Sequence, residues 1–262
     1  MPESSGAIVP LPAAVESSQP LVTIITATFN AAATLQACLE SVRSQDYPNI
    51  EHLIIDGGST DSTIAILQAY ATPGTWVSEP DGGIYDAWNK GLAMARGEWI
   101  AFVGADDVLL PGAVSAYMRL AQAQPQAMYL SSRVQWIGSD GRDRVIGREW
   151  SWPRFQRYMC TAHVGSMHHR YLFEQFGHYD ALLRIVADYE LLLRAGKHLR
   201  AAFLPQVTVR MQGGGNSDRL DALDEATLVK IKTGKRQGWI AAWERFVARL
   251  SFRLRRLFTR RN

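Results

Sequence analysis

Over its first hundred residues the chain alternates short apolar runs with amphipathic segments, and this alternation limits the possible folds more than any other feature. Apolar runs suited to buried strands lie at 21–28, 52–55, 76–78 and 99–103. Segments with the apolar spacing of helices follow the first three runs, the third of them at Ile84–Met94. Strands that alternate with helices form a parallel sheet, so we expect an α/β fold with helices on both faces of a mostly parallel sheet.

Polar residues stand at or just after the end of each apolar run. They are Thr28, Asn30, Asp56, Asp81, Asp106 and Asp107. Open α/β sheets bind ligands at the carboxyl ends of their strands, so we expect these side chains to line one crevice. Two adjacent carboxylates are costly there unless a cation joins them, and a hard divalent ion that also binds phosphate oxygens would do so. The alternative is that one of the two merely caps the helix after Pro111.

The rest of the chain is less regular. We expect a helix at 113–124, a strand at 128–136, a helix at 186–195, a strand at 205–211 and a long helical end from about residue 219. The segment 150–169 is rich in aromatic residues and histidine without clear periodicity, and is predicted to be an irregular region that closes over a substrate. Asn30 is predicted to cap the first helix.

Composition and charge define the class of protein. With 262 residues, of which 47% are hydrophobic and 20% charged, the chain can form one large domain with a sizeable core. We predict a flexible leader at 1–20, a main domain at 21–215 and a basic helical extension at 216–262. Cys38 and Cys160 lack the spacing of a metal site and stand in different segments, which favours a reducing cytoplasm. No run is long and apolar enough to span a bilayer.

Four sequence motifs carry a resemblance to a known family. They are TATFNAAATL at 26–35, IIDGGSTDST at 54–63, EPDGGIYDAWNKGLAMARGEWIAFVGADD at 79–107 and VADYELLLR at 186–194. In this order they resemble the motifs of family 2 inverting glycosyltransferases with the GT-A fold, over roughly residues 22–211. The resemblance implies a nucleotide-diphosphate sugar donor, a divalent cation (Mg²⁺ or Mn²⁺) and an acceptor hydroxyl attacked in one displacement.

The resemblance also implies roles for single residues. Asp188 stands at the family's base position and would take the proton of the acceptor hydroxyl. Asp106 matches the metal-binding second Asp of the family's Asp-x-Asp motif, whose first position is Gly104 here. The implied donor-binding residues are Thr28, Asn30, Asp56, Asp81, Asn89, Lys90 and Asp107.

Structural roles remain open for several of these residues. Asp56 could accept from a pyrimidine imide N–H, or could form a turn or cap a helix. Asp188 could be a helix cap, and Lys90 a solvated charge. His163, His168 and His169 would contact a sugar or bond locally; a dedicated metal site, or one histidine completing the Asp106 site, is the alternative. The aromatic residues of the irregular segment could stack on an acceptor sugar or belong to the core; they are Trp150, Trp152 and Tyr158.

Two other classes of function compete with sugar transfer. A sugar-nucleotide pyrophosphorylase normally has a Gly-rich loop with a basic residue after the first strand, whereas this chain has Thr-Phe-Asn-Ala at 28–31. A non-catalytic nucleotide-sugar or glycan-binding module would lose the carboxylates, and Gly104 keeps that possibility open. Processive members of the family usually carry a Gln/Arg-x-x-Arg-Trp signature and transmembrane helices, and this sequence shows neither. We therefore expect the transfer of one sugar, within bacterial cell-surface polysaccharide synthesis.

The C-terminal segment has the pattern of a basic amphipathic helix. From 235 to 262 nine Lys or Arg residues stand against one Glu, although the whole chain has a formal charge of only +3. Apolar residues recur on one helical face and arginines on another; they are Trp239, Trp243, Phe246, Leu250, Leu254 and Leu257, and Arg245, Arg249, Arg253, Arg256 and Arg260. We predict that 239–262 binds an anionic membrane surface and holds the protein at the inner face of the cytoplasmic membrane, near a saccharide or lipid-linked acceptor. No nucleic-acid partner is expected. The alternative is a terminal helix docked on the body with a solvated basic side.

Overall fold

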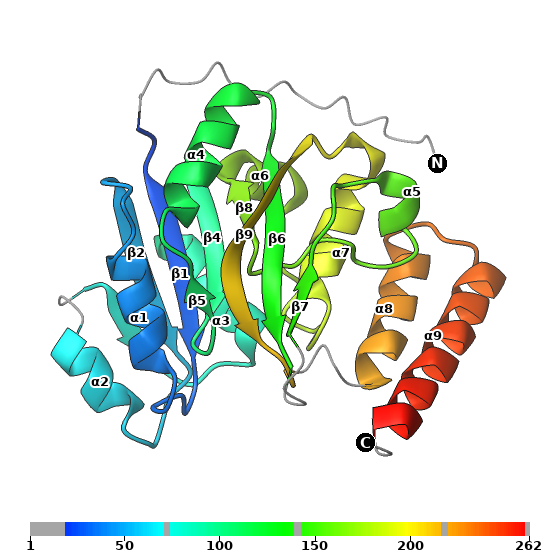
Figure 1. Cartoon of the computed structure of the whole chain (residues 1–262), viewed down its shortest axis with the longest axis horizontal. Coiled ribbons are helices and arrows are strands. Elements are labelled where there is room, and N and C mark those ends of the chain that lie inside the picture. Colours follow the sequence, from blue (N-terminus) through cyan, green and yellow to red (C-terminus); the bar gives the residue numbers. More distant parts are fainter. Residues whose placement is uncertain (1–18, 71–73, 139–142, 216–219, 260–262) are drawn as a thin grey trace.

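The computed structural model describes residues 19–70, 74–138, 143–215 and 220–259, with side chains as far as Phe252 in the last helix (Figure 1). The strands are β1 (Val22–Thr28), β2 (Ile50–Asp56), β3 (Trp76–Ser78), β4 (Trp99–Gly104), β5 (Val108–Leu109), β6 (Tyr129–Ile137), β7 (Asp143–Ile146), β8 (Ser166–His169) and β9 (Ala201–Gln212). The helices are α1 (Leu35–Arg43), α2 (Thr63–Tyr70), α3 (Ile84–Met94), α4 (Ala113–Ala123), α5 (Trp152–Phe155), α6 (Arg170–Phe176), α7 (Ala187–Ala195), α8 (Leu220–Lys232) and α9 (Gly238–Thr259).

All of these strands belong to one sheet, in the order β3-β2-β1-β4-β8-β6-β9-β5, with β7 paired to β6. The first four strands run parallel to one another, which confirms the α/β prediction from the alternating pattern. The short strand β8 runs antiparallel between β4 and β6. The sheet is therefore parallel in the half built from the first hundred residues and mixed in the other half.

Helices cover both faces of the sheet, and alternate strand residues face opposite layers. Val22 and Ile24 of β1 pack in a cluster with residues of α1 and α4. Ile25 and Ala27 point the other way, into a cluster with α3, α6 and α7. Helix α3 approaches β1 so closely at Gly91 that a Cβ there would lie 2.5 Å from Cγ2 of Ile25. Glycine at this position therefore lets α3 pack directly against the sheet.

The parallel register places the strand ends side by side. Thr28 pairs with Asp56, Asp56 with Ser78, and Ala27 with Gly104. The polar residues that end β1 and β2 and those that follow β4 thus meet at one edge of the sheet, as the alternation predicts.

Two local predictions from the sequence are wrong. The segment 150–169 is not irregular throughout, because its last four residues form β8 in the middle of the sheet. Asn30 does not cap α1, which begins at Leu35 with Thr34 at the cap position. Asn30 instead adopts a left-handed backbone (φ 48°), which asparagine tolerates better than most residues, and its Oδ1 accepts a hydrogen bond from the Thr60 amide at 2.8 Å.

The helical end of the chain forms two helices that pack side by side next to α7 (Figure 1). Helix α8 lies between α7 and α9, which confirms a C-terminal helical extension. Among the residues that the structure describes, no helix combines the length and apolar character needed to cross a bilayer. The predicted leader lies almost wholly outside the described residues, and the boundaries at 20 and 215 stay predictions.

Candidate functional site

Interlocked loops at the ends of β1 and β2 hold the first group of predicted donor-binding residues. The buried Asp56 carboxylate accepts hydrogen bonds from the amides of Gly58 and Ser59 at 3.0 and 2.9 Å and from the Ser78 hydroxyl at 2.7 Å. Asp56 therefore does form the turn after β2, and a donor contact by the same carboxylate stays a prediction. The Thr28 hydroxyl is buried beside it and has no hydrogen-bond partner among the described residues.

The loop after β3 brings a second carboxylate to the same edge. The Asp81 side chain lies so close to Gly57 that a Cβ there would be 2.6 Å from Asp81 Oδ2. Asp81 Oδ1 accepts a hydrogen bond from the Gly83 amide at 2.8 Å, at the start of α3. The structure thus places Asp81 next to the Asp56 turn, as the strand-end argument requires.

Asn89 and Lys90, on α3, make contacts with the protein itself. Asn89 exchanges two hydrogen bonds with the Tyr179 backbone, at 2.9 and 3.1 Å. Lys90 Nζ lies 2.9 Å from Glu79 Oε1 and donates to the Pro80 carbonyl at 3.0 Å, so Lys90 is an ion-paired group rather than a freely solvated charge. Both residues brace loops around the strand edge, and their predicted donor contacts are untested.

The adjacent carboxylates after β4 occupy different environments. Asp106 is exposed, whereas Asp107 is buried and accepts a hydrogen bond from the Gly104 amide at 3.2 Å. A Cβ at residue 104 would lie 2.9 Å from Asp106 Oδ1 and 2.9 Å from Asp107 Oδ2. The two carboxylates therefore fill the space that a side chain at Gly104 would take. Burial, and next the charge of Asp106, raises the pKa of Asp107 to about 7.

This carboxylate pair fits a hard divalent cation that phosphate oxygens help to hold. Asp106 offers an exposed carboxylate at the strand edge, with Asp107 buried beside it, and carboxylate oxygens are the ligands that Mg²⁺ and Mn²⁺ prefer. Within the described part of the chain no three His, Cys, Asp or Glu side chains gather closely enough to form a complete metal cage.

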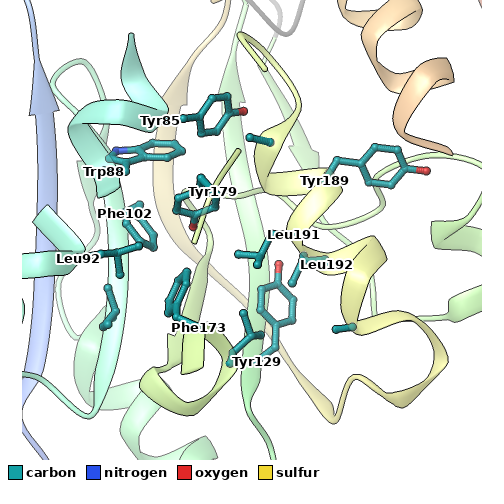
Figure 2. Close-up of a cluster of buried hydrophobic side chains, with 14 of the residues drawn as sticks. Tyr85, Trp88, Leu92, Phe102, Tyr129, Phe173, Tyr179, Tyr189, Leu191 and Leu192 are labelled. Atoms are coloured by element: carbon teal, nitrogen blue, oxygen red, sulfur yellow. The ribbon is translucent and has the colours of Figure 1, made fainter. Parts of the chain in front are cut away.

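Asp188 lies in the first turn of α7 and is held from α3. Its Oδ1 accepts hydrogen bonds from the Tyr85 hydroxyl at 3.0 Å and from the Tyr189 amide at 2.8 Å. Tyr85 reaches from α3 toward the segment that precedes α7 (Figure 2), and its single hydroxyl proton is shared between the Ile185 carbonyl at 2.6 Å and Asp188 Oδ1 at 3.0 Å. Val186 occupies the cap position of α7 without a side-chain capping bond, and Asp188 accepts from the Tyr189 amide, a free amide of the first turn, so a structural role in the first turn of α7 accompanies its predicted role as the base.

Burial sets the acid–base properties of this pair. It raises the pKa of the Asp188 carboxyl to about 6, partly offset by the hydrogen bonds it accepts. Burial and the Asp188 charge raise the pKa of the Tyr85 phenol well above its usual value, so Tyr85 stays protonated and can donate. Asp188 is thus a carboxylate whose proton affinity suits general base catalysis near neutral pH.

His163 lies directly behind Asp188 in an aromatic cluster. Its ring packs 4.5 Å from the Trp88 ring and stacks 5.3 Å from the Phe102 ring, centroid to centroid, and its Nδ1 is 4.0 Å from Asp188 Oδ2. Burial, and secondarily His168, holds the pKa of His163 well below its usual value, so the ring is neutral. Neither of its nitrogens has a hydrogen-bond partner among the described residues, and the same holds for the Tyr179 hydroxyl (Figure 2).

The other residues of the aromatic segment have structural positions. His168 is buried in β8, and His169 caps α6 by accepting from the Tyr171 amide at 3.2 Å. Trp150 and Trp152 are partly buried against the core beside Phe155, which agrees with the core alternative for them, whereas Tyr158 is exposed.

Sequence reasoning missed Tyr85 beside Asp188, and it named His163 without placing it there. Tyr85 follows the Gly82-Gly83-Ile84 turn within the third motif, which is the signal that could have drawn attention to it. Its contact with Asp188 joins residues 103 positions apart, and His163 approaches Asp188 from a third segment, so sequence spacing indicated neither contact.

Comparison with known proteins shows the family to which the chain belongs. Residues 23–173 match the model of a family described as Glycosyl transferase family 2. The chain belongs to this family. It is 32% identical over 188 residues to a PGL/p-HBAD biosynthesis glycosyltransferase of Mycobacterium bovis, an alignment that covers 67% of this chain and 69% of that protein. It is 37% identical over 191 residues to an uncharacterised glycosyltransferase of Mycobacterium tuberculosis, covering 68% and 70%.

Solved structures with the same fold support the GT-A architecture. S. aureus TarS 1–349 in complex with UDP-GlcNAc superposes with a TM-score of 0.67 at 17% identity, covering 84% of this chain and 69% of that one. The chain spans 41% of a longer TarS chain. The mannosyltransferase PcManGT of Pyrobaculum calidifontis, in complex with GDP-Man and Mn²⁺, gives a TM-score of 0.62 at 21% identity, covering 84% and 65%. This member of glycosyl transferase family 2 therefore has the GT-A fold.

Proposed function

We propose that this glycosyltransferase moves one sugar from a nucleotide-diphosphate sugar to an acceptor hydroxyl with inversion at the anomeric carbon. The observation that carries the proposal is Asp188, a partly buried carboxylate with a raised pKa that a protonated Tyr85 contacts at 3.0 Å. A non-catalytic glycan-binding module would have no need of a carboxylate kept at this free-energy cost. Family membership likewise favours sugar transfer over a pyrophosphorylase.

In the proposed reaction Asp188 is the general base. The acceptor oxygen attacks the anomeric carbon while its proton passes to a carboxylate oxygen of Asp188, and the bond from the sugar to the diphosphate breaks with its electron pair on the leaving oxygen. Asp188 Oδ2 is the oxygen that Tyr85 and the Tyr189 amide leave free, so we assign the proton to it. Before the reaction, the Tyr85 hydroxyl stabilises the ionised form of Asp188 and holds this carboxylate in position to take the proton.

We assign the donor to the edge formed by β1, β2, β3 and β4. We assign Thr28, Asn30 and Asp56 to the nucleoside and Asp81, Asn89, Lys90 and Asp107 to the diphosphate sugar. Asp106 would hold Mg²⁺ or Mn²⁺, and the Mn²⁺ and GDP-Man of PcManGT support such a pairing of metal and diphosphate. A bound divalent ion would neutralise charge on the departing diphosphate.

The acceptor is assigned to bacterial cell-surface glycan synthesis, as a saccharide or a lipid-linked saccharide. The PGL/p-HBAD biosynthesis enzyme of Mycobacterium bovis, a relative by sequence, supports an acceptor in a surface glycoconjugate. We place the protein in the cytoplasm, peripherally at the inner face of the cytoplasmic membrane, where such an acceptor would be presented. Residues 239–262 are the segment assigned to that surface.

Two measurements, made one after the other, test the proposed function. Thermal unfolding with a panel of nucleotide diphosphates, each with Mg²⁺ or Mn²⁺, identifies the donor nucleotide by the increase in Tm. NMR of the early product made from the matching nucleotide sugar and an acceptor then gives its anomeric configuration. Inversion is expected, whereas retention, or a Tm that no nucleotide diphosphate raises, contradicts the proposal.

A further inference from the structure

The last helix packs on the protein with its polar side inward. Ala241 is fully buried, and Glu244 lies 3.2 Å from Lys230 Nζ of α8 and forms an ion pair with Arg236. Further along α9, Arg245 and Arg249 both form ion pairs with Asp224 of α8. Because Ala241 is buried and these charged groups pair with groups of the body, this side of α9 faces the body.

The opposite side of α9 is apolar and exposed. Trp239, Trp243 and Phe246 expose 74%, 63% and 58% of their surface, and Val247 and Leu250 are also exposed. The Trp243 and Phe246 rings stack 5.7 Å apart, so the side chains form a continuous apolar strip. We call these five residues the outer face of α9. The helix is docked on the body, as the sequence-based alternative expects, but the exposed side is the apolar one, and the described arginines form ion pairs with α8.

We propose that the outer face of α9 inserts into the surface of an anionic lipid bilayer. Exposed tryptophan and phenylalanine on one face of a basic helix are typical of helices that lie in the headgroup region. Of the nine Lys or Arg residues between 235 and 262, three form ion pairs with Glu244 or Asp224, and the other six complement an anionic surface rather than a second basic copy of the same helix. Arg245 and Arg249 face α8, so the apolar strip makes the membrane contact.

This inference rests on the proposed function in one respect: the purpose of membrane binding would be access to a lipid-linked acceptor. Its test needs no donor, acceptor or turnover. Loss of activity with normal vesicle binding would therefore contradict the proposed function alone, and normal activity without vesicle binding would contradict this inference alone.

The test is sedimentation of the full chain with vesicles of phosphatidylglycerol and phosphatidylethanolamine, and with neutral phosphatidylcholine vesicles for comparison. The triple variant Trp239→Ser, Trp243→Ser and Phe246→Ser removes most of the outer face without touching a buried contact. We expect the partition coefficient for anionic vesicles to fall by about a hundredfold, since apolar burial in the interface is lost. The matched control replaces two exposed apolar residues elsewhere, Val145→Ser with Leu182→Ser, and should bind as the natural chain does.

A second readout locates the inserted residues. Brominated acyl chains should quench the tryptophan fluorescence of the natural chain and of the control, but not that of the triple variant. Equal vesicle binding by the triple variant and the natural chain overturns the proposal. So does self-association of the natural chain in ultracentrifugation that the triple variant loses while vesicles are ignored, because the outer face would then be a contact between copies.

Discussion

Replacing Tyr85 with Phe removes the hydroxyl that contacts Asp188, the proposed base, and leaves the aromatic ring of residue 85 in place. That hydroxyl donates to Asp188 Oδ1 at 3.0 Å, and the Tyr189 amide is the other donor to the same oxygen. A hydrogen bond to a charged group contributes about 1.5–3 kcal/mol to stabilising the charged form. Because the hydroxyl proton is shared with the Ile185 carbonyl, the lower end of this range applies; about 1.4 kcal/mol corresponds to one pKa unit, so the pKa of Asp188 should rise by about one unit from its value of about 6.

The direction of the pH effect follows from the role of the carboxylate. A general base acts in its ionised form, so turnover should fall as the pH drops through the pKa of Asp188. In the variant this acid limb should move upward by about one pH unit. At pH 6.5 the ionised fraction would fall from about three quarters to about one quarter, whereas above pH 9 the two proteins should have similar rates.

The assay is the pH dependence of kcat under saturating donor, with Tyr117→Phe as the matched control. Tyr117 is another buried tyrosine, and its hydroxyl bonds Ser132 at 2.8 Å rather than Asp188. The control should keep the acid limb of the natural enzyme. An acid limb that stays in place in Tyr85→Phe would refute the inference that Tyr85 sets the ionisation of Asp188.

Three further variants probe the surroundings of the base and the strand edge. Asp106→Asn should fold normally, because the side chain is exposed, and should lower metal-dependent transfer by about a thousandfold; near-normal turnover, or full activity of the natural enzyme in excess EDTA, would contradict this. Gly104→Ala should displace both carboxylate oxygens that lie 2.9 Å from the added Cβ, so its Mn²⁺ titration should show weaker binding with little change in Tm, and unchanged Mn²⁺ affinity would contradict the crowding argument. His163→Phe should keep or raise the free energy of unfolding, because it removes two unpartnered buried nitrogens, yet lower kcat by about tenfold if His163 supports the base; lower stability with unchanged kcat would contradict both expectations.

The parts of the fold that the sequence predicts are those built from local periodicity. Helix α3 occupies Ile84–Met94 as its apolar spacing indicates, and β1 and β4 lie within one residue of their predicted bounds. Strand β8 could not be seen in this way, because it is four residues long and is defined by its pairing with β4 and β6. Its residues, Ser-Met-His-His, have no strand periodicity of their own.

The residues of the site are of the same two kinds: some follow from the local sequence pattern, and others are brought together only by tertiary packing. Residues at strand ends, such as Asp56, Asp81 and Asp106, could be placed from the order of strands and helices alone. The support of Asp188 by Tyr85 could not, since it depends on how α3 packs against the segment before α7. Similarly, the periodicity of α9 predicts an apolar face, but the buried Ala241 and the ion pair of Glu244 with the buried Lys230 of α8 show that this face points outward.

The most direct test of the account is the turnover of Asp188→Asn beside that of the natural enzyme, with saturating nucleotide sugar and acceptor. Asparagine keeps the shape of the side chain and removes its ability to take a proton, so the variant should bind donor with nearly unchanged affinity. Its kcat should fall by about a hundredfold or more, as expected for loss of a general base. A variant that binds donor normally and keeps a kcat within about threefold of the natural enzyme would contradict the assignment of Asp188 as the base.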